Sequence, residues 1–190
     1  LNVFEDKLVV EEKGIYSVEQ FIVARRIMYW QVYFHKAVIA SEVMLKKALE
    51  RAKELKNKTE LFSTPTLGFF ILNGDKFTNR NDELPLDEFA NLDDSDITVS
   101  LKEWMKHDDR VLSTLSANLI NRELFKIEIS NRAYDEQLII SLKEKASKKY
   151  NLSENEVNYF VFSDKIINKA YSTEQDSRIN IYLKSGEVLD

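Results

Sequence analysis

Four side chains spaced three or four residues apart could bind a phosphorylated, ring-bearing ligand: Arg25, Tyr29, Tyr33 and Lys36. At about 100° per residue they fall within an arc of roughly 80° on one face of a helix. An arginine suits bidentate contact with phosphate, and a tyrosine offers a ring for stacking and a hydroxyl for hydrogen bonds. The alternative is structural: the tyrosines are ordinary core aromatics, and Arg25 pairs with a carboxylate such as Glu19. The residue types alone leave both interpretations open.

The helix that must position these side chains is expected between residues 17 and 56. Ser17 followed by Gln20 predicts a capping box, and no Pro or Gly interrupts the stretch, which predicts one long helix or two in line. From residue 21 to 44 apolar or aromatic side chains occur on almost every side, so we expect protein around the helix on nearly all sides. Charged residues leave no apolar run of the ~18–20 residues that a membrane span needs: Arg25, Arg26, Lys36 and Glu42.

The composition limits the class of protein. The chain has 190 residues, enough for one domain or one domain with an appendage, and it contains no cysteine, so disulfides and thiolate metal sites are excluded. The net charge is −5 without a basic block, which argues against nucleic acid as the main partner. The sequence starts at Leu1 without a signal-peptide pattern, so we expect a fragment of a cytoplasmic protein with no membrane partner.

Local patterns predict the elements that follow. Thr64-Pro65 starts a helix that ends near Asn73-Gly74, residues 79–83 form an exposed loop, and Pro85 opens a short helix. A helical hairpin follows, with its first helix starting at Ser95 and its turn at residues 106–109.

The last third of the chain shows mixed patterns. Alternating residues predict strands at 125–129 and 179–183, and an apolar run predicts a strand at 159–162. A helix is expected at 135–149, and a short turn is expected after a capping box formed by Ser153 and Glu156. The predicted fold is a mostly α-helical body (residues 1–124) followed by a small α+β subdomain (residues 125–190).

Two stretches carry a family resemblance: residues 12–17, Glu-Lys-Gly-Ile-Tyr-Ser, and residues 24–36, Ala-Arg-Arg-Ile-Met-Tyr-Trp-Gln-Val-Tyr-Phe-His-Lys. They resemble the region that follows the metal core in HD-superfamily phosphohydrolases, in particular the deoxynucleoside triphosphate triphosphohydrolase (dGTPase)-like group. Further similar segments are found at residues 92–96, 102–104, 121–126 and 159–162. The resemblance covers most of the chain and implies the C-terminal part of an all-α HD-type domain.

The resemblance also implies roles for the residues above. Arg25 would contact the triphosphate, Tyr29 would lie beside the nucleotide and Tyr33 would read the sugar. Three further residues would face a regulatory nucleotide or a subunit contact: Lys13, His35 and Lys36. The parent protein would be a homo-oligomer that hydrolyses deoxynucleoside triphosphates to nucleoside and triphosphate with a divalent metal such as Mg²⁺ or Mn²⁺.

A literal His-Asp pair does occur in the chain, at His107-Asp108. In the family the metal-binding pair precedes the arginine-to-lysine motif, whereas here it follows that motif by about 70 residues. It also falls at the predicted hairpin turn, where Asp109 would cap the next helix. We therefore expect no metal site in this fragment, which alone would be inactive, with the metal ligands in the missing N-terminal half. The alternative is a non-catalytic helical module for oligomerisation or interaction, with the α+β tail as its interaction surface.

Overall fold

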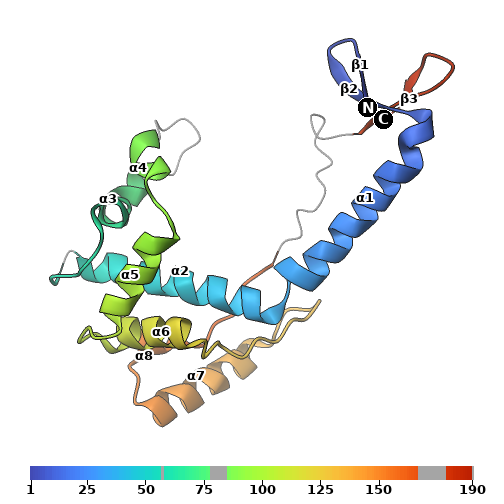
Figure 1. Cartoon of the computed structure of the whole chain (residues 1–190). Coiled ribbons are helices and arrows are strands. Elements are labelled where there is room, and N and C mark those ends of the chain that lie inside the picture. The colour runs from blue at the N-terminus through green and yellow to red at the C-terminus, as the bar shows by residue number, and fades with distance from the viewer. Residues whose placement is uncertain (57, 78–84, 167–178, 190) are drawn as a thin grey trace. The chain divides into compact units, whose positions relative to one another are not determined.

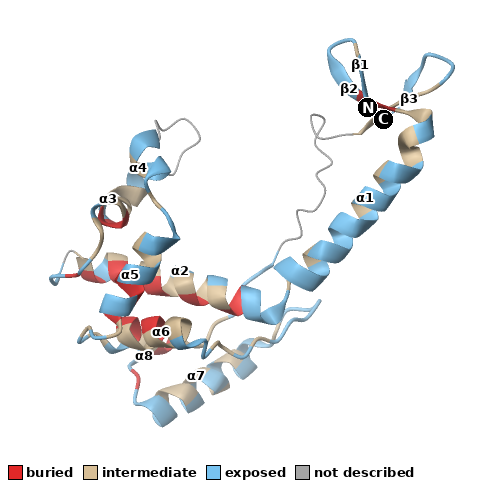
Figure 2. Ribbon diagram, viewed as in Figure 1, coloured by how far each residue is buried: buried red, intermediate tan, exposed pale blue. Residues whose placement is uncertain are grey.

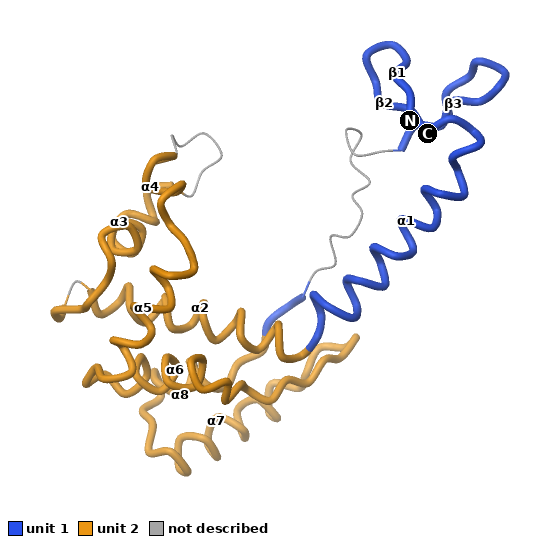
Figure 3. Tube along the Cα trace, viewed as in Figure 1, with its two compact units in different colours: residues 1–35, 164–190 blue, residues 36–163 orange. Residues whose placement is uncertain are grey.

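The computed structural model describes residues 1–56, 58–77, 85–166 and 179–189. The chain forms two compact units, one of Leu1–His35 with Asp164–Asp190 and the other of Lys36–Ser163 (Figure 3). Its described elements are mostly helices with one small sheet (Figure 1), which confirms the predicted fold class. The predicted boundary between residues 124 and 125 concerns domains of the complete protein and stays a prediction.

The first unit contains a sheet built from both ends of the chain. Among the described residues its strands run in the order β1 (Asn2–Phe4), β2 (Lys7–Glu11), β3 (Asn180–Tyr182) and β4 (Val188–Leu189). β2 and β3 are parallel, with Val10 opposite Ile181, and the other pairs are antiparallel. The predicted strand at 179–183 is thus confirmed, but its pairing with the N-terminal strands was not foreseen.

The first helix of this unit begins earlier than predicted. The 3₁₀ turn η1 (Glu12–Gly14) runs directly into α1 (Ile15–Met28), which continues as the π-helical turn η2 (Tyr29–Tyr33). The predicted capping box at Ser17 is wrong, because the backbone N–H of Ile15 already bonds to the carbonyl of Glu12 and Ser17 lies inside the helix. The long stretch 17–56 is therefore α1, a π-helical turn and a separate helix α2 (Lys36–Lys56).

The second unit has the hydrophobic core. Helix α2 packs against α6 (Arg110–Asn121), and α5 (Asp94–Trp104) and α3 (Pro65–Asn73) complete the cluster. Buried residues gather where these helices meet (Figure 2). The main core side chains are Ala48, Ala52, Leu55, Leu67, Ile71, Leu101, Trp104, Val111, Leu112 and Leu115. Trp104 also donates its indole N–H to the carbonyl of Phe62 at 2.8 Å, so this large ring is both packed and satisfied.

Most predicted helix starts in this unit are confirmed. Thr64 Oγ1 accepts from the N–H of Leu67 at 3.3 Å, and Asp109 accepts from Leu112 at the start of α6. Helix α5 begins one residue before Ser95, because Asp93 and not Ser95 makes the capping box. Short elements lie between, namely η3 (Gly74–Phe77) and α4 (Leu86–Ala90). The loop predicted at 79–83 lies outside the described residues.

The region after α6 differs most from the prediction. Helices α7 (Glu136–Tyr150) and α8 (Glu154–Val157) are confirmed, the latter with its predicted capping box. The predicted strands at 125–129 and 159–162 are wrong, since neither segment pairs with another in the described chain. Aromatic contacts hold them instead: the ring of Phe125 lies 6.1 Å from Phe160 and 6.4 Å from Phe162. Phe125 packs against the core, whereas Ile129 is 46% exposed, so alternation identified only part of the inward face and could not supply a partner strand.

Candidate functional site

Three of the four predicted ligand-binding side chains lie together on α1 and η2. The guanidinium carbon of Arg25 lies 5.5 Å from the ring centroid of Tyr29, within the range of a cation–π contact. The rings of Tyr29 and Tyr33 are 4.9 Å apart between centroids and tilted by 46°. We call Arg25, Tyr29 and Tyr33 the ladder, because each side chain contacts the next along one face of the helix.

The ladder is open to solvent in this chain. Tyr29 is half-buried, Arg25 is exposed, and no residue of α1 or η2 is buried (Figure 2). The prediction that this helix is surrounded by protein is therefore not met within the chain itself. Apolar side chains stand exposed along α1 and η2, among them Phe21, Val23, Ile27, Met28, Trp30 and Val32. Large apolar side chains exposed in this number along one helical segment are typical of a segment that another domain or chain covers.

The π-helical turn interrupts the predicted stripe. The N–H of Phe34 donates to the carbonyl of Tyr29 at 2.8 Å, five residues back, and His35 donates its N–H to Val32 at 3.2 Å. The regular 100° step thus ends at Tyr29. Lys36 is the first residue of α2 and belongs to the other unit, so the prediction of one continuous four-residue stripe is wrong.

The remaining predicted residue, Lys13, lies in η1. Its ammonium group is 2.7 Å from the carboxylate of Glu11; Lys13 is exposed and Glu11 is half-buried. The hydrogen bond with Glu11 raises the pKa of Lys13. An ion pair at the surface contributes little to stability. The structure therefore provides no contact between Lys13 and the ladder, and its regulatory role stays a prediction.

Sequence reasoning missed Phe34, which contacts the ladder from the end of the π-helical turn. Its ring meets Tyr29 edge-on at 6.0 Å and Trp30 at 5.6 Å. The signal was present in the sequence as two aromatic pairs, Tyr29-Trp30 and Tyr33-Phe34, spaced four residues apart. That pattern is also compatible with an ordinary α-helix, so it does not announce a π-helical turn.

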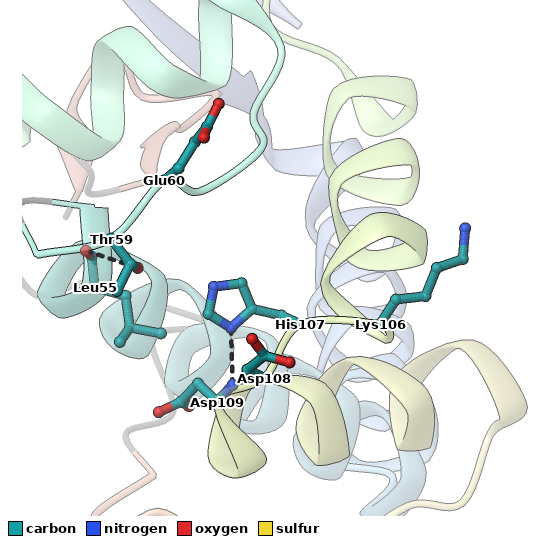
Figure 4. A pocket seen from close by; sticks show the side chains of 7 residues that line it. All are labelled: Leu55, Thr59, Glu60, Lys106, His107, Asp108 and Asp109. Carbon is teal, nitrogen blue, oxygen red and sulfur yellow. Dashed lines mark hydrogen bonds between the residues drawn. The ribbon is translucent and has the colours of Figure 1, made fainter.

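A second candidate site is an open pocket of about 550 Å³ in the other unit, at the turn between α5 and α6 (Figure 4). It is lined by Leu55, Thr59, Glu60, Lys106, His107, Asp108 and Asp109. His107 Nδ1 accepts from the backbone N–H of Asp109 at 2.9 Å, so a neutral ring carries its proton on Nε2. The side chain of Lys106 points away from His107 (Figure 4).

The His-Asp pair in this pocket is part of a turn, as predicted. The Asp109 carboxylate is engaged by Arg51, with Nε to Oδ1 at 3.1 Å and Nη2 to Oδ2 at 2.6 Å, and it caps α6. The described residues contain no group of three or more His, Asp or Glu side chains that could hold a metal ion. The donor set of the described chain therefore does not fit a divalent metal.

Comparisons with known proteins extend this description. Residues 1–64, which include the ladder, match the family model for the HD associated region. The chain is similar to a crystal structure of a phosphohydrolase from Bacteroides thetaiotaomicron, with 44% sequence identity and a TM-score of 0.81 over 98% of this chain. These similarities support an HD-type phosphohydrolase.

A further relative is the uncharacterized protein YwfO of Bacillus subtilis (strain 168), which is 37% identical over 122 residues, or 64% of this chain. The chain spans 46% of the phosphohydrolase of known structure and 27% of YwfO. Both relatives thus contain long segments with no counterpart in this chain. Among the described residues no helix is both long and apolar enough to cross a membrane.

Proposed function

We propose that this chain is the C-terminal part of a metal-dependent HD-type phosphohydrolase that hydrolyses deoxynucleoside triphosphates to nucleoside and triphosphate. The observation that carries the proposal is the ladder, in which a guanidinium lies over one phenol ring and a second phenol ring lies against the first. The similarity of residues 1–64 to the HD associated region and the similarity of nearly the whole chain to a phosphohydrolase support it.

Each member of the ladder has a role that suits its chemistry. Arg25 stabilises negative charge on the phosphates through its planar, permanently charged guanidinium. Tyr29 provides a ring beside the nucleotide, and Tyr33 offers its hydroxyl to the sugar. The exposure of Arg25 and Tyr33 leaves both side chains accessible to a ligand.

The metal ion of the proposed reaction is bound outside this chain. The described part of the chain lacks a suitable donor cluster, and His107 is committed to the turn before α6. The segments that both relatives have in addition would supply the ligands. This chain contributes nucleotide-binding residues and is inactive alone.

The same missing segment is the proposed cover for the exposed apolar surface of α1. A helix with apolar side chains on almost every side forgoes the favourable free energy of burying them for as long as it remains in water. The second candidate function, a non-catalytic oligomerisation module, rests on this same exposed surface, and homo-oligomers are expected under both. Oligomeric state therefore does not separate the two candidates.

Activity of the complete protein does separate them. With dGTP as the probe substrate and Mn²⁺ present, we expect triphosphate release, and we expect Arg25→Ala to lower kcat/KM by a factor corresponding to about 2–4 kcal/mol of transition-state stabilisation. Arg26→Ala is the matched control, since it removes the same charge from the neighbouring position, and it should retain activity within about twofold. Equal activity of the Arg25→Ala variant and the unaltered protein would reject the proposed role and favour the module.

A further inference from the structure

The contact between Phe34 and Tyr29 depends on the π-helical turn. In a regular α-helix a residue five positions on lies about 140° around the axis, so Phe34 would point away from Tyr29. Tyr33, the last residue of η2, and Phe34, the residue after it, both contact the Tyr29 ring, at centroid distances of 4.9 and 6.0 Å. The extra residue in the turn thus gives Tyr29 two aromatic neighbours on its C-terminal side.

Phe34 is fixed by both its backbone and its ring. Its N–H closes the turn on the carbonyl of Tyr29, and its backbone has φ −96° and ψ 12°, a sparsely populated conformation typical of the end of a turn. Its ring meets Trp30 at 82° and Tyr29 at 72°, the edge-on geometry that aromatic pairs favour. It is half-buried, whereas Trp30 and Val32 are 57% and 52% exposed.

We propose that Phe34 is a positioning residue for the ring-binding end of the ladder. By holding the π-helical turn it sets the angle at which Tyr29 and Tyr33 meet a base and a sugar, without contacting the ligand itself. The backbone that carries Arg25 lies in the regular part of α1, before the turn, so we expect its phosphate contact to persist without the Phe34 ring. The inference rests on the proposed function, because it assigns a role within the same nucleotide site.

The test uses the complete protein with Mn²⁺, dGTP as the substrate and inorganic tripolyphosphate as a competitive inhibitor. Phe34→Leu keeps an apolar side chain of similar size and removes the ring. We expect the KM for dGTP to rise about three- to tenfold, as loss of an aromatic pair implies, with kcat within about twofold. The inhibition constant of tripolyphosphate should not change, because that probe contacts only the phosphate end.

Two further variants make the outcome specific. Phe34→Tyr retains the ring and should restore the KM of the unaltered protein. Gln31→Ala changes an exposed polar side chain of the same turn, outside both the ladder and the apolar surface, and it should leave both constants unchanged. The hydrogen bond from the backbone N–H of residue 34 to the carbonyl of Tyr29 marks the π-helical turn. In hydrogen exchange, the amide of residue 34 should therefore exchange faster in Phe34→Leu than in Phe34→Tyr.

The possible failures are distinguishable. If Phe34→Leu weakens the binding of tripolyphosphate and of dGTP equally, the residue is merely structural and the inference is wrong. The same holds if Phe34→Tyr does not restore the KM for dGTP. If Arg25→Ala changes neither the kinetic constants for dGTP nor the inhibition constant of tripolyphosphate, the proposed function fails. If Arg25→Ala weakens the binding of both probes while Phe34→Leu leaves the KM for dGTP unchanged, the proposed function stands and this inference alone is overturned.

Discussion

At the scale of single residues, the Asp109 carboxylate joins α2 to α6 and is part of a network that reaches a third segment of the second unit. It accepts two hydrogen bonds from Arg51 of α2 and one from the N–H of Leu112 in α6. Arg51 also binds Glu54, which accepts from the hydroxyl of Tyr159 at 2.6 Å. Burial raises the pKa of Asp109, but the hydrogen bonds from Arg51 and Leu112 outweigh it and leave the pKa below its ordinary value.

This pKa predicts a pH-dependent effect of Asp109→Asn. Asparagine can still cap α6 but cannot pair with the Arg51 charge, so we expect a loss of about 2 kcal/mol of unfolding free energy at neutral pH. Because the folded-state pKa is lowered, the stabilisation is present above the ordinary aspartate pKa of about 4 and disappears as pH falls through the folded-state value. Urea denaturation at several pH values should show the two proteins converging in acid.

The neighbouring Asp108→Asn is the control for this experiment, because Asp108 is exposed and lines only the open pocket. It should unfold as the unaltered protein does at every pH. A gap between Asp109→Asn and the unaltered protein that stays constant from neutral pH to pH about 2 would show that the Arg51 ion pair does not stabilise the fold.

At the scale of elements, the sequence predicted what local chemistry decides. The caps at Thr64, Asp109 and Ser153 follow from a side-chain oxygen placed just before a helix, so short-range reasoning found them. The π-helical turn was missed because neither Gly nor Pro marks it. The Phe34 ring contacts favour the turn, but the aromatic spacing behind them is equally compatible with a regular α-helix. The strands at 125–129 and 159–162 failed because a strand needs a distant partner that alternation cannot reveal.

The packing of α5 on α6 encloses two hydroxyl groups without hydrogen-bond partners in the described structure, those of Ser100 and Ser116. Both side chains are fully buried. A buried hydroxyl that makes no hydrogen bond loses its hydration without compensation. We therefore expect Ser100→Ala and Ser116→Ala each to raise the free energy of unfolding by about 1 kcal/mol, measured by urea denaturation.

Ser113 of α6, the helix that carries Ser116, offers the matched control. Its hydroxyl donates to the carbonyl of Asp109 at 2.8 Å, so Ser113→Ala removes a satisfied bond and should bring no gain. Stabilities of Ser100→Ala and Ser116→Ala at or below that of Ser113→Ala would mean that these buried hydroxyls do have partners in solution.

At the scale of the whole molecule, the two ends of the chain cooperate in one sheet. β2 leads through η1 into α1, which bears Arg25, and its neighbour β3 comes from the C-terminal end. The N–H of Lys184 also donates to the carboxylate of Glu12 at 3.2 Å. Pairing between segments some 170 residues apart leaves no local signal, so the sequence could predict β3 itself but not its contribution to the unit that contains the ladder.

A single substitution in β3 tests this dependence. Ile181 lies opposite Val10 where β3 pairs in parallel with β2, and opposite Leu189 where β3 pairs antiparallel with β4. Ile181→Pro removes a backbone donor from the middle of the sheet, whereas Ile181→Val retains the backbone and a β-branched side chain. We expect the proline variant to exchange the Val9 and Val10 amides about 100-fold faster than the valine variant does.

The core of the second unit provides the internal reference for that measurement. Leu112 and Leu115 are fully buried in α6, and the two compact units divide the chain at residue 36, so their amides should keep their protection in both variants. Faster exchange throughout α6 would mean that the two units unfold together. Unchanged protection of Val9 and Val10 would mean that the N-terminal hairpin holds without β3, and then the C-terminal strands would not be needed to support the helix with the ladder.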